Sequence, residues 1–79
     1  MESHEIIRML IEQRPNMTQH KLGGKIGFIP QTMSKRMNAR RLGVDFFVKA
    51  LNGLDYKLVA IPKDDRLPRN AILVTAEEE

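Results

Sequence analysis

The sequence predicts a mainly α-helical domain of four short helices followed by a C-terminal β-strand or β-hairpin. Apolar residues recur at helical spacing in four windows between residues 3 and 54. Two β-prone runs then occupy residues 56–61 and 71–75. A length of 79 residues without cysteine allows one domain with a small core and no disulfide. We therefore expect packing, supplemented by association with a second copy, to supply the stability.

The first helix is expected over Ser3 to Gln13. Ser3 can cap it with its hydroxyl, and the residue before Pro15 disfavours helical geometry, so the helix should end there. Its apolar stripe consists of Ile6, Ile7, Leu10 and Ile11.

Two further helices, joined by a tight turn, are expected over Gln19 to Ile26 and Pro30 to Met37. Thr18 can cap the first, Gly27 can supply the left-handed residue that ends it, and Pro30 suits the first turn of the next. Small Gly23 should let the two helices approach closely. The four apolar residues of the pair that should face inward are Leu22, Ile26, Met33 and Met37.

Residues 18–35 carry the pattern Thr-Gln-x-x-Leu-small-x-x-Ile-Gly followed by x-x-x-Gln-Thr-Met-Ser-Lys. This pattern resembles the helix-turn-helix of the XRE-like family, which includes Cro and the lambda-type phage repressors. Gly24 and Ile29 depart from the family pattern, and the extra glycine should cost the helix about 1 kcal/mol relative to alanine. The resemblance implies a four-helix Cro/repressor-like domain over residues 1–55, with the helix from Pro30 placed in a DNA major groove.

The polar side chains expected on the outer face of the Pro30 helix match base edges. Gln31 can form two hydrogen bonds to adenine, Thr32 can touch a thymine methyl, and Lys35 can donate to guanine. Ser34 can read a base or remain an ordinary surface residue.

The charge is unevenly distributed along the chain. Seven of the 13 basic residues, and none of the ten acidic ones, lie between Glu12 and Asp45, so a net charge of +3 conceals a strongly basic block. Such a block favours a surface that binds polyanions. The predicted phosphate-binding residues are Thr18, Gln19, Lys21, Lys25, Arg36, Asn38, Arg40 and Arg41, of which Thr18 and Gln19 resemble the family's phosphate clamp.

A fourth helix is expected over Val44 to Leu54, after a loop over residues 38–43. Its core-facing stripe should contain Val44, Phe47, Val48, Leu51 and Leu54. Phe46 falls outside this stripe and, with Ala50, can contact another subunit.

Residues 56–76 are expected to extend the domain as β-structure, either as a hairpin or by pairing with a second copy, and residues 77–79 to form a disordered acidic tail. The predicted dimer interface comprises Phe46, Ala50, Val59, Ile61, Ile72 and Val74.

These features predict a homodimeric repressor that binds double-stranded DNA at an inverted repeat. The alternative is an antitoxin or similar small module that sequesters a partner protein, such as a toxin. An enzyme is not expected, because no nucleophile with a paired base is evident, and His4 and His20 alone make no metal site. No cofactor is predicted. Without an export signal or a membrane-spanning run, the expected location is the cytoplasm.

Overall fold

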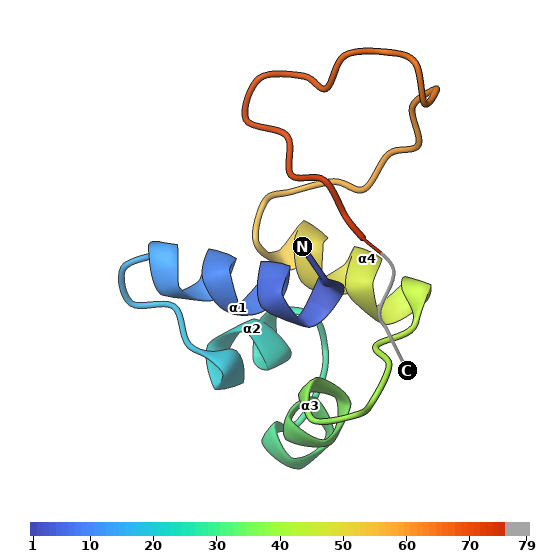
Figure 1. Cartoon of the computed structure of the whole chain (residues 1–79). Coiled ribbons are helices and arrows are strands. Elements are labelled where there is room, and N and C mark those ends of the chain that lie inside the picture. The colour runs from blue at the N-terminus through green and yellow to red at the C-terminus, as the bar shows by residue number, and fades with distance from the viewer. Residues whose placement is uncertain (76–79) are drawn as a thin grey trace.

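The computed structural model describes residues 1–75 as four α-helices and a long C-terminal segment (Figure 1). The helices are α1 (Ser3–Gln13), α2 (Gln19–Lys25), α3 (Pro30–Met37) and α4 (Val44–Gly53). Each helix agrees with its predicted range to within one residue, so the helical part of the predicted fold is confirmed. The acidic residues 77–79, predicted to be disordered, lie outside the described residues.

Local signals set the ends of α2. The Thr18 hydroxyl accepts a hydrogen bond from the Lys21 backbone N–H at 3.1 Å, so Thr18 caps the helix as predicted. Gly27 has φ +92°, and the Phe28 N–H behind it donates to the Gly23 carbonyl at 2.7 Å. This bond from beyond the glycine to the last turn is the Schellman arrangement, which satisfies a carbonyl that the helix itself leaves unpaired. Ser3, by contrast, is the first residue of α1 and does not cap it.

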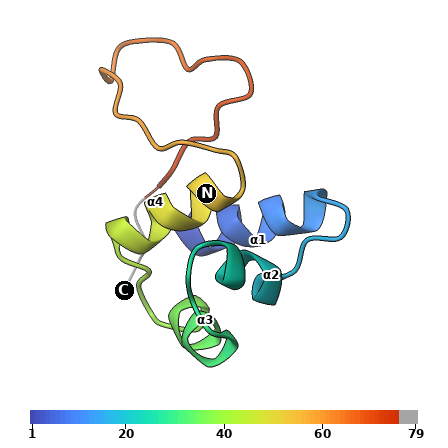
Figure 2. The same cartoon turned by 180° about the vertical axis from the view of Figure 1, so that it is seen from behind.

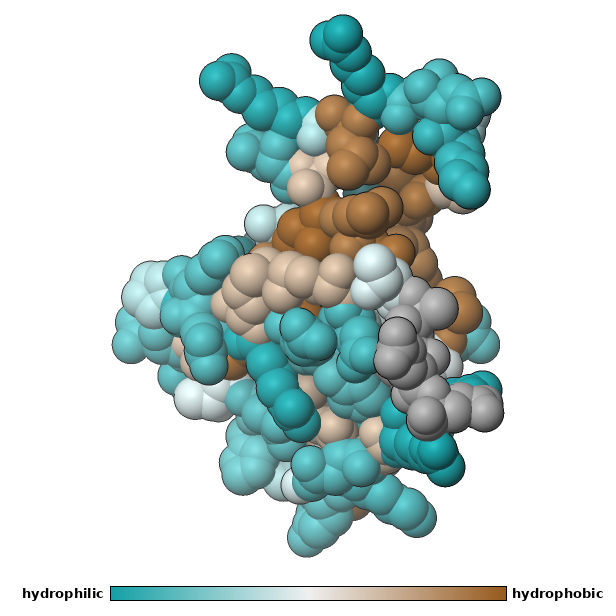
Figure 3. Space-filling model, in the orientation of Figure 1, coloured by the Kyte–Doolittle hydropathy of each residue, from teal (hydrophilic) through white to brown (hydrophobic). Residues whose placement is uncertain are grey.

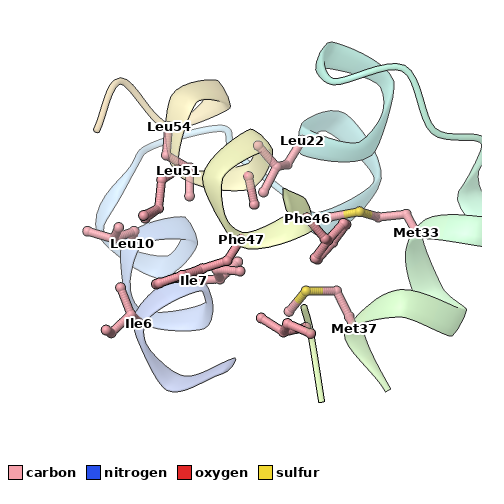
Figure 4. Close-up of a cluster of buried hydrophobic side chains, with 12 residues drawn as sticks. Ile6, Ile7, Leu10, Leu22, Met33, Met37, Phe46, Phe47, Leu51 and Leu54 are labelled. Carbon is pink, nitrogen blue, oxygen red and sulfur yellow. The ribbon is translucent and has the colours of Figure 1, made fainter. Parts of the chain in front are cut away.

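The core lies around α4, which has α1 on one side and α2 and α3 on the other. Figure 4 shows Phe47 directed toward Ile7 of α1, whereas Phe46 lies beside Met33 of α3. The buried apolar residues are Ile6, Ile7, Leu10, Leu22, Met33, Met37, Leu42, Phe46, Phe47, Ala50, Leu51 and Leu54.

The predicted stripe of α4 is wrong at two positions. Val44 is 70% exposed, whereas Phe46, predicted to lie outside the stripe, is only 4% exposed. Because α4 packs on two sides, its buried face is wider than one stripe. Phe46 stacks on Phe28 with ring centroids 5.6 Å apart, and the Lys49 ammonium lies 5.9 Å from the Phe28 ring centroid. The stack and the cation–π contact fasten the turn before α3 to α4.

Glycines allow α2 to approach both of its neighbours. A Cβ built on Gly23 would lie 2.8 Å from Cγ and 2.9 Å from Cβ of Met33. A Cβ on Gly53 would lie 2.7 Å from side-chain atoms of both Ile26 and Leu22. The predicted close approach at Gly23 is therefore confirmed, and a second one occurs between α2 and α4.

The predicted C-terminal strands are absent from the described part of the chain. Residues 56–75 form an open loop that projects from the helices on the side away from α3 (Figures 1 and 2). Pro62 and Pro68 lie between the two predicted strands, and neither has a backbone N–H to donate to a strand. In addition, a two-stranded ribbon on its own is marginal in water. The Thr75 N–H donates to the Met1 carbonyl at 2.8 Å, and the Met1 amino group donates to the Leu73 carbonyl at 3.0 Å.

An ion pair joins the ends of α1 and α4. The Arg14 guanidinium donates to an Asp55 carboxylate oxygen at 2.5 Å. This hydrogen bond, aided by the positive charges of Lys25 and of Arg14 itself, lowers the pKa of Asp55 from its ordinary value of 3.8. Asp55 has φ +65°, a conformation that aspartate and asparagine tolerate better than most residues.

We predict that Gly23→Ala and Gly24→Ala have opposite effects on the free energy of unfolding. The added methyl group at Gly23 must displace Met33, which should cost about 1–3 kcal/mol. No atom lies within 4 Å of the corresponding position at Gly24, so alanine there should stabilise α2 by up to about 1 kcal/mol. Urea denaturation followed by circular dichroism measures both values. Equal effects at the two positions would contradict the close approach of α2 and α3.

We predict that Asp55 stabilises the fold only while its carboxylate is ionised. Its pKa is lower in the folded chain than in the unfolded chain, so its contribution is complete above the ordinary pKa of 3.8 and is lost as the pH falls through the folded-state pKa. Asp55→Asn should therefore lower the melting temperature near neutral pH, and the difference from wild type should shrink below about pH 4.

Asp64→Asn removes an exposed carboxylate of the C-terminal loop and serves as the control for that experiment. It should leave the pH dependence of the melting temperature unchanged. A constant difference between Asp55→Asn and wild type from neutral pH to below pH 3 would rule out the proposed role of the ion pair.

Candidate functional site

The two faces of α3 differ in burial and in chemistry. Met33 and Met37, four residues apart, are buried to 0% and 1% exposure and hold the helix against the core. Four polar residues between and beside them remain at least partly accessible. Gln31 and Lys35 are exposed, and Thr32 and Ser34 are half-buried. All four predicted base-reading residues are therefore accessible on one short helix, as expected from the spacing of the methionines.

The start of α3 is apolar and exposed. Ile29 occupies the N-cap position in an extended conformation, makes no side-chain capping bond and is 63% exposed. Pro30 follows at the first helical position, where its missing N–H costs nothing. The chain thus places a large aliphatic side chain directly before the polar residues of α3. Its exposure was not predicted from the sequence.

Both of the predicted phosphate-binding lysines make intramolecular hydrogen bonds. The Lys21 ammonium donates to the Asn16 carbonyl at 2.8 Å, and the Lys25 ammonium donates to the Gly53 carbonyl at 2.8 Å. Lys25 therefore satisfies a carbonyl at the end of α4, where a positive charge also complements the helix dipole. An outside anion would have to compete with these bonds.

The other predicted phosphate-binding residues lie at the two ends of the α2–α3 pair. Thr18 is exposed and Gln19 half-buried at the start of α2. The residues at and beyond the end of α3 are all exposed, namely Arg36, Asn38, Arg40 and Arg41. No acidic residue occurs between Glu12 and Asp45, so α2, α3 and the following loop themselves contribute only positively charged side chains.

Two side chains of α1 contact the chain at the end of α3. His4 Nε2 donates to the Ala39 carbonyl at 2.9 Å, and the Arg8 guanidinium lies 3.4 Å from the Met37 carbonyl. These contacts anchor the exit of α3 and the loop that carries Arg40. The sequence pattern contains no signal for them, because 35 and 29 residues separate the partners.

Only some of the residues predicted to form the dimer interface lie on the surface. Phe46 and Ala50 are buried in the core at 4% and 0% exposure, so their assignment to an intersubunit contact is wrong. Ile72 is half-buried against the core, whereas Val59, Ile61 and Val74 are exposed. Phe46 and Ala50 are buried because α4 packs on two sides, and the spacing of apolar residues along one helix does not show how many of its faces are covered.

The C-terminal loop nevertheless bears a large apolar surface, visible as brown patches in Figure 3. Seven large side chains between residues 56 and 75 are 38–61% exposed. We call this set the apolar extension; it consists of Tyr56, Leu58, Val59, Ile61, Leu67, Leu73 and Val74. A cavity of about 270 Å³ lies between the extension and the helices, lined by Ile6, Phe47 and Leu51 on the helical side.

Within residues 1–75, no cluster of three or more histidine or acidic side chains can hold a metal ion. In the same range, no helix has the length and apolar character needed to cross a membrane. No protein-family model matches the chain, and no curated protein or solved structure is significantly similar to it.

Proposed function

We propose that this chain is a sequence-specific DNA-binding regulator of transcription, acting as a homodimeric repressor. The observation that carries the proposal is the two-faced character of α3. Its methionines are buried, while Gln31, Lys35 and the flanking polar residues are accessible, and the segment between Glu12 and Asp45 contributes no acidic side chain. A short exposed helix of this kind fits the major groove, where side-chain amides, ammonium groups and methyl groups distinguish base pairs.

The residues divide into two roles. Gln31 pairs with adenine, Thr32 contacts a thymine methyl group and Lys35 donates to guanine, so these side chains supply specificity. The exposed residues after α3, together with the start of α2, contact phosphates and supply most of the affinity. Lys21 and Lys25 contribute mainly through their charge, because their ammonium groups already have acceptors within the chain.

The apolar extension supports association of two copies. Its seven large apolar side chains are 38–61% exposed, and an exposed apolar patch on a small domain commonly marks an interaction site. A stable interface takes about 800 Å² from each partner, to which the charged residues around the extension would contribute a polar rim. The same patch on both copies then forms a two-fold contact.

The position of the extension restricts the geometry of this dimer. The extension and α3 lie at opposite ends of the molecule (Figures 1 and 2). Both α3 helices face the same DNA only when the two-fold axis runs along the direction from the extension to α3, with the two extensions side by side. An inverted-repeat operator with half-sites about 34 Å apart follows from this arrangement. Occupying a promoter is sufficient for repression.

The second candidate function is binding of a different protein, such as a toxin, and the same apolar extension favours it. In that case the extension covers a partner's surface instead of a second copy. The oligomeric state of the isolated chain separates these two functions, since only self-association produces a dimer without a partner.

We predict that Gln31→Ala and Arg40→Ala weaken DNA binding in different ways. Loss of the amide should cost about 1–3 kcal/mol on the best site and flatten base preference at one position. Loss of the guanidinium should weaken binding to every duplex and reduce the dependence of affinity on salt. Selection from random duplex DNA, followed by titration of the selected site at several salt concentrations, measures both effects.

Gln13→Ala and Arg69→Ala are the matched controls, because both residues are exposed and lie outside α2, α3 and the following loop. Neither change should alter base preference. Equal losses on all sequences after Gln31→Ala would contradict its base-reading role, and failure of the wild-type chain to bind any duplex would disprove the proposed function.

We predict that Val59→Lys converts a dimer into a monomer. Val59 is 61% exposed within the apolar extension, and a buried unpaired ammonium at a two-fold contact would be present twice. Val44→Lys makes the same change at a still more exposed valine of α4 and should leave the dimer intact. Sedimentation equilibrium gives the mass. A wild-type chain that stays monomeric at a protein concentration of about 100 μM, which is about 100 times a dissociation constant of 1 μM, would contradict self-association.

A further inference from the structure

Ile29 is the one large apolar side chain that residues 2–43 leave exposed. It is 63% exposed and lies directly before α3, where the accessible side chains after Pro30 are polar. The apolar extension projects on the side of the molecule away from α3, so Ile29 is not part of that patch (Figures 1 and 2). Single apolar side chains are common on protein surfaces, so exposure alone assigns Ile29 no role.

The backbone on both sides of Ile29 is held in place. Before it, the Phe28 N–H donates to the Gly23 carbonyl at 2.7 Å, and the Phe28 ring stacks on a phenylalanine of α4. After it, Pro30 has a fixed φ, and the Ile29 carbonyl accepts a hydrogen bond from the Met33 N–H at 2.9 Å. A β-branched side chain also has few rotamers, so a contact made by Ile29 costs little conformational entropy.

We propose that Ile29 is a specificity-determining residue that packs on a thymine methyl group in the major groove. This inference rests on the proposed function, because it places α3 in that groove. The C5 methyl group of thymine is the apolar group that base edges present there, and the other groups donate or accept hydrogen bonds. The side chain of Ile29 cannot satisfy those polar groups and would cover them from water. It therefore favours thymine over the other bases.

The position of this thymine follows from the distance along the chain. Gln31, which is proposed to bind adenine, lies two residues after Ile29, and two Cα–Cα steps span at most about 7 Å. Successive base pairs are about 3.4 Å apart along the duplex, so the thymine should lie within about two base pairs of that adenine. Thr32 lies three residues after Ile29, a spacing at which side chains of a helix are neighbours, and its methyl group extends the same apolar contact.

The test uses the full chain and the duplex that it selects from random sequence. Each thymine within two base pairs of the position at which Gln31→Ala flattens base preference is replaced in turn by deoxyuridine. This replacement removes one methyl group and keeps every hydrogen-bonding group of the base pair. Wild type should lose about 3- to 5-fold in affinity at one of these thymines, the effect of burying one methyl group. Ile29→Ala should bind the thymine and deoxyuridine duplexes equally.

Val44→Ala is the matched control, because it shortens an aliphatic side chain that is still more exposed and lies at the start of α4. It should keep the wild-type preference for thymine over deoxyuridine. Ile29→Val keeps a branched aliphatic side chain and should retain part of that preference. Since both positions are exposed, all three variants should melt close to the wild-type temperature in circular dichroism.

The outcomes separate the role of Ile29 from the proposed function. Base-selective binding to a site without a thymine in that window would overturn the role of Ile29 and leave the proposed function standing. Equal wild-type affinities for the thymine and deoxyuridine duplexes would do the same, as would an unchanged preference for thymine in Ile29→Ala. A wild-type chain that selects no duplex would contradict both.

Discussion

The close approach of α2 to two neighbouring helices is the constraint on which the rest of the structure depends. Gly23 leaves room for the side chain of Met33, and Gly53 leaves room for the side chains of Leu22 and Ile26. The backbone of α2 can therefore lie close to α3, and the backbone of α4 close to α2. A helix of seven residues is too short to be stable alone in water. The contacts of α2 with α3 and α4 therefore offset the destabilising effect of its two glycines. The same contacts determine where α3 lies.

The accessible face of α3 follows from these contacts. Burial of the two methionines orients the helix, the stack of Phe28 on Phe46 fastens the turn before it, and His4 binds the carbonyl of Ala39 after it. Each restraint comes from a different element, so the orientation of α3 is fixed by contacts with several parts of the chain. Preorganisation of this kind lowers the entropy that binding would otherwise cost.

The two ends of the molecule have opposite chemistry. The end formed by α3 is polar and lacks acidic residues, whereas the loop of residues 56–75 exposes apolar side chains (Figures 1 and 3). A small domain buries a smaller fraction of its surface than a large one. In this chain the core is formed by the helices packed on both sides of α4. The side chains of the extension lie outside this core and remain exposed.

The sequence by itself determined the helices and their ends, because Thr18, Gly27 and Pro30 act through bonds and torsions within a few residues. It also determined which residues of α3 are accessible, since the spacing of two methionines orients so short a helix. The tertiary structure alone decided that Phe46 is buried, that Lys25 binds the carbonyl of Gly53, and that residues 56–75 form no strand. Those outcomes depend on partners distant along the chain: a second packed face, a helix end 28 residues away, and a neighbouring strand that the described chain does not provide.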